Sequence, residues 1–123
     1  MKKKSVIAVF ENDALNRFIY QRMLDLQDEK VQFYVFTSSQ EGLEVAKQVH
    51  FDIAFIDLHF QGEHKGIELA KKLKTISDMT IMVGMTTLLQ KGDLELARAG
   101  GFVTCREKPL PFYDIDMLLN EIG

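Results

Sequence analysis

The sequence has little cysteine and proline, no tryptophan, and no long apolar run. A single cysteine, Cys105, excludes an intrachain disulfide and suits a reducing compartment. The apolar runs are far shorter than the roughly 20 residues that a membrane-spanning helix needs. The basic start, Met1 to Lys4, precedes only a short apolar run, which is not the pattern of a secretory signal peptide. These absences predict a cytoplasmic protein without a membrane segment.

Basic residues are not concentrated in any stripe beyond the N-terminal lysines, and the formal net charge is −3. Direct binding to nucleic acid is therefore not expected. The length of 123 residues, with 46% hydrophobic and 27% charged residues, is typical of one globular domain with one core, here residues 1–123.

Short apolar runs alternate with segments of helical spacing along the whole chain. The runs predict five strands, at residues 5–10, 31–36, 51–57, 80–85 and 102–106. Five helices are expected between and after them, at about residues 14–26, 39–50, 66–75, 88–99 and 112–121. This alternation predicts an α/β fold with a parallel sheet and right-handed crossovers.

Three local signals refine the helices. In the first helix, apolar residues recur at helical spacing, at Leu15, Phe18, Ile19, Met23 and Leu26. Ser38, followed three residues later by Glu41, is a capping-box signature for the start of the second helix. The fourth helix offers a weak apolar face, which predicts that it is loosely held and movable.

Polar side chains follow the predicted strands at the points where these end. Asp57 ends the third strand, Glu11 and Asn12 follow the first, Thr86 and Thr87 follow the fourth, and Lys108 follows the fifth. The carboxyl ends of parallel strands share one edge of the sheet, where ligands bind in open α/β folds. Clustered carboxylates favour Mg²⁺, and a carboxylate with an ammonium and a hydroxyl nearby suits phosphoryl transfer. Asp57 is therefore a candidate phosphoryl acceptor.

Five pieces of the chain, in order, resemble the receiver domain of two-component response regulators. These pieces are residues 11–17 (Glu-Asn-Asp-Ala-Leu-Asn-Arg), residues 51–58, residues 66–70, the threonine after the fourth strand, and Lys108-Pro109. The resemblance covers essentially the whole chain. It implies a flavodoxin-like receiver fold, with a five-stranded parallel sheet of order 2-1-3-4-5 flanked by five helices.

The resemblance also implies a role for each matching residue. Asp57 would be the phosphoacceptor, and Lys108 would pair with the phosphoryl group. Glu11, Asn12, Asp57 and the backbone carbonyl of His59 would bind Mg²⁺. Thr86 would be the switch hydroxyl, with Thr87 as the alternative.

Three positions depart from the family pattern. Asn12 replaces a carboxylate, which predicts weaker Mg²⁺ binding and slower phosphorylation. Gln61 stands where the family commonly has proline, in a loop one residue longer than usual. Cys105 occupies the position of the aromatic switch residue, so another residue or a shift of the 86–90 loop would have to report phosphorylation.

The sequence thus predicts a phosphoacceptor signalling module and not an enzyme with an external turnover substrate. A sensor histidine kinase or phosphotransfer protein would donate the phosphoryl group, and an effector protein or output domain would respond. A homodimer through the face of the fourth helix, fifth strand and fifth helix stays open, as does the attachment of this domain to a longer regulator.

Two alternatives remain. The first is a degenerate receiver that binds partners without phosphorylation, which Asn12 favours. The second is a flavodoxin-like cofactor-binding enzyme, which would need a glycine-rich phosphate loop after the first strand; residues 11–14 offer none.

Overall fold

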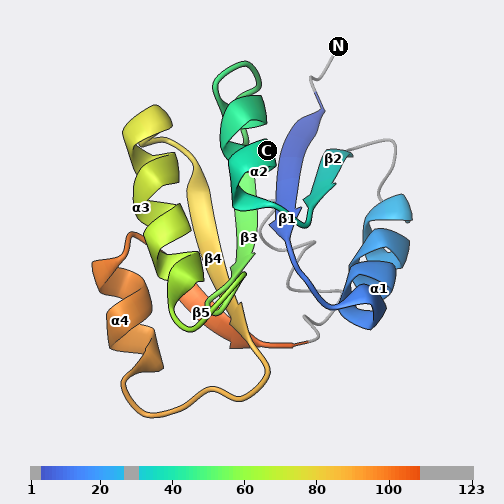
Figure 1. The fold of residues 1–123 in the computed structure, drawn as a ribbon. Helices are drawn as coiled ribbons and strands as arrows, with labels where there is room; N and C mark the ends of the chain where they lie inside the picture. The colour runs from blue at the N-terminus through green and yellow to red at the C-terminus, as the bar shows by residue number, and fades with distance from the viewer. Residues whose placement is uncertain (1–3, 27–30, 109–123) are drawn as a thin grey trace.

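The computed structural model describes residues 4–26 and 31–108. The elements in chain order are β1 (Ser5–Phe10), α1 (Ala14–Asp25), β2 (Val31–Phe36), α2 (Ser39–Ala46), β3 (Ile53–Asp57), α3 (Lys65–Ile76), β4 (Ile81–Thr86), α4 (Asp93–Ala99) and β5 (Thr104–Glu107) (Figure 1). The fifth expected helix, at residues 112–121, lies outside the described residues. Within the described ranges, no helix is long and apolar enough to cross a membrane.

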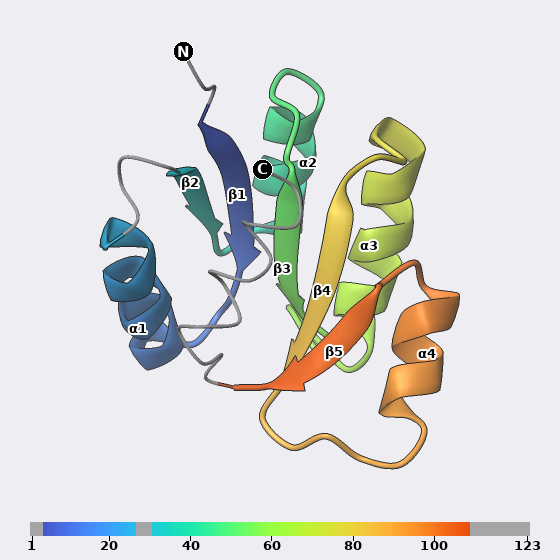
Figure 2. The same cartoon turned by 180° about the vertical axis from the view of Figure 1, so that it is seen from behind.

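The strands form one parallel sheet in the order β2-β1-β3-β4-β5, which confirms the predicted fold (Figure 2). The register pairs Ile7 of β1 with Phe33 of β2 and with Ile53 of β3. Because all strands run in the same direction, their carboxyl ends meet at one edge of the sheet. That edge is where the predicted site should lie.

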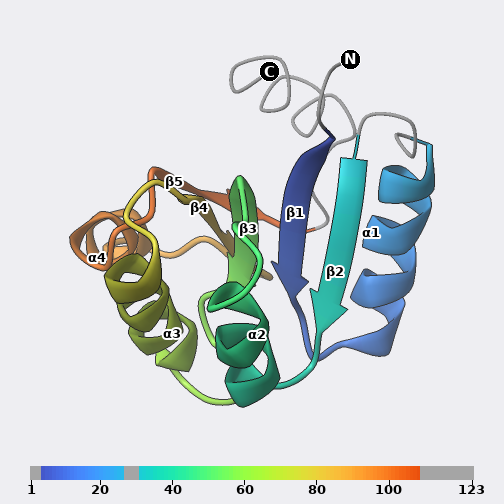
Figure 3. The same ribbon diagram turned by 90° about the horizontal axis from the view of Figure 1, so that it is seen from above.

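Both faces of the sheet are covered, so the strands alternate between two apolar cores (Figure 3). α1 packs on one face, over a core that includes Val9, Phe55 and Tyr20. α2, α3 and α4 cover the other face, whose core includes Phe10, Ile56 and the apolar side of α3. Burial on both faces explains why the central strands read as continuous apolar runs.

α1 faces the sheet with a different stripe from the one that its apolar spacing suggests. Leu15, Phe18 and Leu26 are exposed, by 66%, 62% and 76%. Tyr20 is buried instead, and Met23 packs beside the same core. Successive helical residues are about 100° apart, so Leu15 and Phe18 lie roughly 140° and 160° around the helix from Tyr20, on the side away from the sheet. The helix carries apolar residues on two stripes, and only one of them meets the sheet.

Two helix boundaries differ from expectation. α2 ends at Ala46 and not near residue 50. α4 begins at Asp93 and not at residue 88, because Gly92 adopts a left-handed conformation, with φ of 92°, that cannot continue a right-handed helix backwards. The N-cap of α2 is as predicted, with the Ser38 hydroxyl accepting a hydrogen bond from Glu41 N at 3.3 Å.

Candidate functional site

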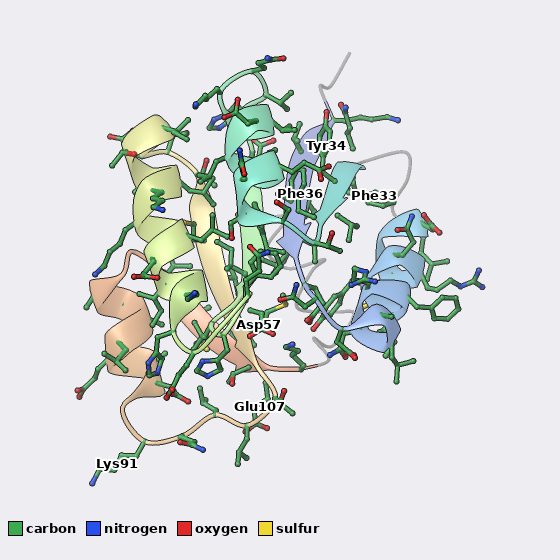
Figure 4. All side chains as sticks on the ribbon, in the orientation of Figure 1. Phe33, Tyr34, Phe36, Asp57, Lys91 and Glu107 are labelled. Carbon is green, nitrogen blue, oxygen red and sulfur yellow. The ribbon has the colours of Figure 1, made fainter. Side chains whose placement is uncertain are left out.

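The predicted site lies at the carboxyl edge of the sheet. Glu11 directly follows β1, Asp57 and Thr86 end β3 and β4, and Lys108 directly follows β5. Figure 4 shows Asp57 at this edge, with Glu107 of β5 on the same side of the molecule. Side chains that are far apart in the sequence are therefore brought together by the parallel arrangement.

Lys108 is the centre of the site. Its Nζ lies 2.6 Å from Asp57 Oδ2 and 2.7 Å from Glu11 Oε1. The side chains of Lys108 and Glu11 are only 5% and 1% exposed, and that of Asp57 is 15% exposed. Burial opposes the ammonium charge, but the hydrogen bonds that Lys108 donates to Asp57 and Glu11 outweigh it and hold the pKa of Lys108 above its ordinary value. Two carboxylates around one ammonium leave a net charge of −1.

Asp57 is held by the start of the β3–α3 loop. Its second oxygen, Oδ1, accepts a hydrogen bond from His59 N at 2.8 Å. Its backbone carbonyl accepts from Phe60 N at 3.0 Å, and Leu58 O accepts from Gly66 N at 2.9 Å. α3 therefore begins very close to the end of β3, and a Cβ built on Gly66 would lie 1.9 Å from Asp57 O. Only glycine allows this approach.

Asn12 lies beside the ion pair but is engaged elsewhere. Its Oδ1 accepts a hydrogen bond from Gln61 N at 2.8 Å, and its Nδ2 donates to Thr37 O at 3.4 Å. Its backbone carbonyl accepts from the Arg17 guanidinium. The side chain thus joins the β1–α1 loop to two other loops.

Thr86 and Thr87 differ in their surroundings. Thr86 is buried and Thr87 is exposed. The Thr86 hydroxyl donates to Leu88 O at 3.4 Å, and its backbone carbonyl accepts from Lys108 N at 2.8 Å. Of the two candidates for a switch hydroxyl, Thr86 is therefore the one whose contacts to the β4–α4 loop and to the residue that carries the site ammonium are described.

The oxygen atoms at this edge fit a hard divalent cation in chemical type. Two carboxylates leave an excess negative charge after pairing with Lys108, and an amide oxygen and backbone carbonyls lie nearby. Among the described residues, no three His, Cys, Asp or Glu side chains form a metal site by themselves. Mg²⁺ at this edge would therefore need main-chain or amide oxygens besides Glu11 and Asp57. His59 O, one such carbonyl, also accepts from Gly62 N at 3.0 Å.

Sequence reasoning missed the residues that hold the β4–α4 loop. Glu107 Oε1 accepts from Leu89 N at 3.1 Å, and Asp93 Oδ2 accepts from Gln90 N at 2.7 Å. Asp93 is buried. Its place directly after Gly92 is the kind of signal that marks a helix start, whereas Glu107 gives no local signal because its partner is 18 residues away.

Cys105 is a buried small residue. It is 3% exposed, and its sulfur would lie 3.3 Å from a Cβ built on Gly84. Burial, with a smaller contribution from Asp93, raises the pKa of the thiol to about 11. The thiol is therefore protonated near neutral pH, which disfavours reactivity.

The sequence matches the family model described as "Response regulator receiver domain" over residues 7–120. A search of curated proteins finds no match. Similar solved structures include a response regulator from Thermotoga maritima, at 14% identity with a TM-score of 0.82, covering 98% of each chain. A two-component response regulator from Clostridium difficile is 18% identical, with a TM-score of 0.82, and covers 97% of this chain and 95% of that one.

A third similar structure is that of the Saccharomyces cerevisiae histidine phosphotransfer protein Ypd1 with the receiver domain of its downstream response regulator Ssk1. It is 20% identical, with a TM-score of 0.81, and covers 98% of this chain and 89% of that one. At these identities the structures show a shared fold, whereas the family model covers nearly all of the sequence. The chain belongs to the response regulator receiver domain family, the phosphoacceptor signalling modules of two-component systems.

Proposed function

We propose that Asp57 is the residue that accepts the phosphoryl group. The observation that carries this proposal is the buried Lys108 ammonium, 2.6 Å from an Asp57 carboxylate that is itself 15% exposed at the edge of the sheet. In the transfer, an Asp57 oxygen bonds to the phosphorus of a phosphohistidine while the P–N bond breaks. The imidazole leaves, and Asp57 becomes an acyl phosphate.

Lys108 would stabilise the charge that is transferred. The transferring group carries negative charge on its oxygens, and a buried ammonium acts strongly on such charge because little water screens it. His59 N, which already donates to Asp57 Oδ1, supplies a backbone donor next to the reacting carboxylate. Thr86 contributes a hydroxyl that would turn from Leu88 O toward the new phosphoryl group.

Mg²⁺ is the cofactor that we propose for this site. Glu11, Asp57 and the carbonyl of His59 would hold it, whereas the Asn12 amide oxygen, a further ligand by the family resemblance, already accepts from Gln61 N. Bound there, the cation would neutralise phosphoryl oxygens during transfer. Glu11 is well suited to this role because its carboxylate is almost completely buried and shares Lys108 with Asp57.

The partners follow from the chemistry. A histidine kinase or a histidine phosphotransfer protein would donate the phosphoryl group to Asp57. Phosphorylation adds negative charge, which would draw Thr86 and Lys108 inward and alter a surface read by an effector. The domain would assist this transfer and the later hydrolysis on itself only, without turnover of an external substrate.

The direct test is incubation with acetyl phosphate and Mg²⁺, followed by intact-mass measurement. Wild-type protein should gain the mass of one phosphoryl group, and Asp57→Asn should gain none. Asp52→Asn is the matched control, because Asp52 is a carboxylate just before the same strand, and this variant should be labelled like wild type. Labelling of Asp57→Asn to the same extent as wild type would rule out Asp57 as the acceptor.

A degenerate receiver is the second candidate, and the contacts of Asn12 favour it. The side chain that would complete the acidic pair is neutral and is occupied by Gln61 N and Thr37 O. If this candidate is correct, neither wild type nor Asn12→Asp gains a phosphoryl group, and partner binding is the same for wild type and Asp57→Asn.

A further inference from the structure

The two departures from the family pattern beside the site, Asn12 and Gln61, are in direct contact. Gln61 N donates a hydrogen bond to Asn12 Oδ1 at 2.8 Å, across 49 positions of the sequence. A proline at position 61 has no N–H to donate, so this contact requires another residue type there. The contact also requires an acceptor at position 12, which the amide supplies.

Both polar atoms of the Asn12 amide form hydrogen bonds. Oδ1 accepts from Gln61 N, while Nδ2 donates to Thr37 O at 3.4 Å. An aspartate could accept from Gln61 N, but its second oxygen would face the Thr37 carbonyl without a proton to donate. The contacts therefore favour an amide over a carboxylate at this position.

Gln61 adds a second contact to the connection between β2 and α2, which Asn12 already reaches through Thr37 O. Its side-chain Oε1 accepts from Ser39 N, at the start of α2, at 2.9 Å. Its backbone is left-handed, with φ of 63°, a conformation that costs free energy for a residue other than glycine and is closed to proline. The hydrogen bonds to Asn12 and Ser39 offset that cost and fix the loop in this conformation.

The loop that Gln61 anchors also carries the backbone of the site. His59 N donates to Asp57 Oδ1 at 2.8 Å, and His59 O is the candidate carbonyl ligand for Mg²⁺. His59 O also accepts from Gly62 N at 3.0 Å, so Gln61 lies inside the turn that orients this carbonyl. Because Asn12 accepts from Gln61 N, it fixes the position of this loop and thereby the surroundings of Asp57 and of the candidate cation site.

We infer that Asn12 is a positioning residue for the β3–α3 loop and not a metal ligand. The amide oxygen of Asn12 and the backbone N–H of Gln61 form the pair that holds this loop. The part of this inference that concerns Mg²⁺ rests on the proposed function. The part that concerns the loop does not, because the hydrogen bonds need neither metal nor phosphoryl group.

The first measurement is amide hydrogen exchange, read residue by residue by NMR in metal-free, unphosphorylated protein. Asn12→Ala should raise the exchange rate of Gln61 N–H about fivefold or more, since it loses its acceptor. Gln61→Ala is the matched control: it keeps the backbone N–H, so residue 61 should stay protected while Ser39 N–H exchanges faster. Unchanged exchange at Gln61 in Asn12→Ala would overturn the inference.

The second measurement is Mg²⁺ affinity of the unphosphorylated protein, by NMR titration. A ligand role predicts that Asn12→Asp, which adds a ligating charge, tightens binding about tenfold. The positioning role predicts a change below about fivefold, because the new carboxylate is held by Gln61 N. A change of fivefold or more would overturn the inference. If the exchange result holds while no Mg²⁺ binds to any variant, the proposed cofactor fails and the loop role stands.

Discussion

At the scale of single residues, the site depends on Lys108. One ammonium is shared by two carboxylates, and both Lys108 and Glu11 are almost inaccessible to water. Breaking a buried ion pair by removing one partner is costly, because the remaining charge stays in a poorly solvated place. In this site, removal of Lys108 would leave two carboxylates facing each other.

Lys108→Met should therefore destabilise the domain by about 3 kcal/mol at neutral pH, measured by urea unfolding. Lys47→Met is the matched control, because Lys47 pairs with Glu44 at 3.3 Å on the surface, where both side chains are more than half exposed. That variant should unfold like wild type. Equal unfolding midpoints for the two variants would contradict the role of Lys108.

The pH dependence of this difference has a defined sign. Because the pKa of Lys108 is raised in the folded protein, its contribution is complete below the ordinary lysine value of 10.5. It is lost as the pH rises through the higher folded-state value. The stability gap between wild type and Lys108→Met should therefore persist from neutral pH to about pH 10 and close only above it.

At the scale of elements, the junction of β3 and α3 sets the position of Asp57. Gly66 in the first turn of α3 lies against the last residues of β3, and its missing side chain leaves room for the carbonyls of Asp57 and Leu58. Backbone atoms cannot move aside as a flexible side chain can. Any side chain at position 66 must therefore separate the helix from the strand end.

Gly66→Ala should destabilise the domain by about 3 kcal/mol, the upper range for overpacking. Gly92→Ala provides the comparison, since a Cβ there meets nothing within 4 Å and only the left-handed backbone opposes it. We expect about 1 kcal/mol for that variant. Thermal unfolding of both checks the order, and a Gly92 variant as damaged as the Gly66 variant would refute the packing argument.

Part of the arrangement of the helices and strands could be predicted from the sequence. The strands that are buried on both faces could be predicted from the apolar runs. Their order in the sheet could be predicted only from the family resemblance. The start of α4 could not be predicted. Leu88 and Leu89 fit the helical spacing of α4 but lie in the loop before Gly92, whose left-handed backbone separates them from the helix. The hydrogen bond between Asn12 and Gln61 could not be predicted either, since it depends on the left-handed backbone of Gln61.

At the scale of the whole molecule, the site and the β4–α4 loop are joined by two neighbouring strands. Thr86 and Glu107 are paired in the register of β4 and β5, and each holds the loop by one hydrogen bond. The Thr86 hydroxyl donates to Leu88 O, and the Glu107 carboxylate accepts from Leu89 N. Leu88 and Leu89 are exposed, by 62% and 38%, so movement of this loop would change an apolar surface.

Phosphorylation should loosen this loop. If Thr86 turns toward the phosphoryl group, its bond to Leu88 O is lost, and the neighbouring bond from Leu89 N to Glu107 loses the support of a fixed loop. Amide exchange at Leu89 should therefore become faster on incubation with acetyl phosphate and Mg²⁺, while α2 stays unchanged. Glu107→Ala should give fast exchange at Leu89 before phosphorylation, with little further change afterwards. Slow exchange at Leu89 in the phosphorylated wild type would mean that the signal leaves the site by another route, because the bond from Leu89 N to Glu107 would then be intact.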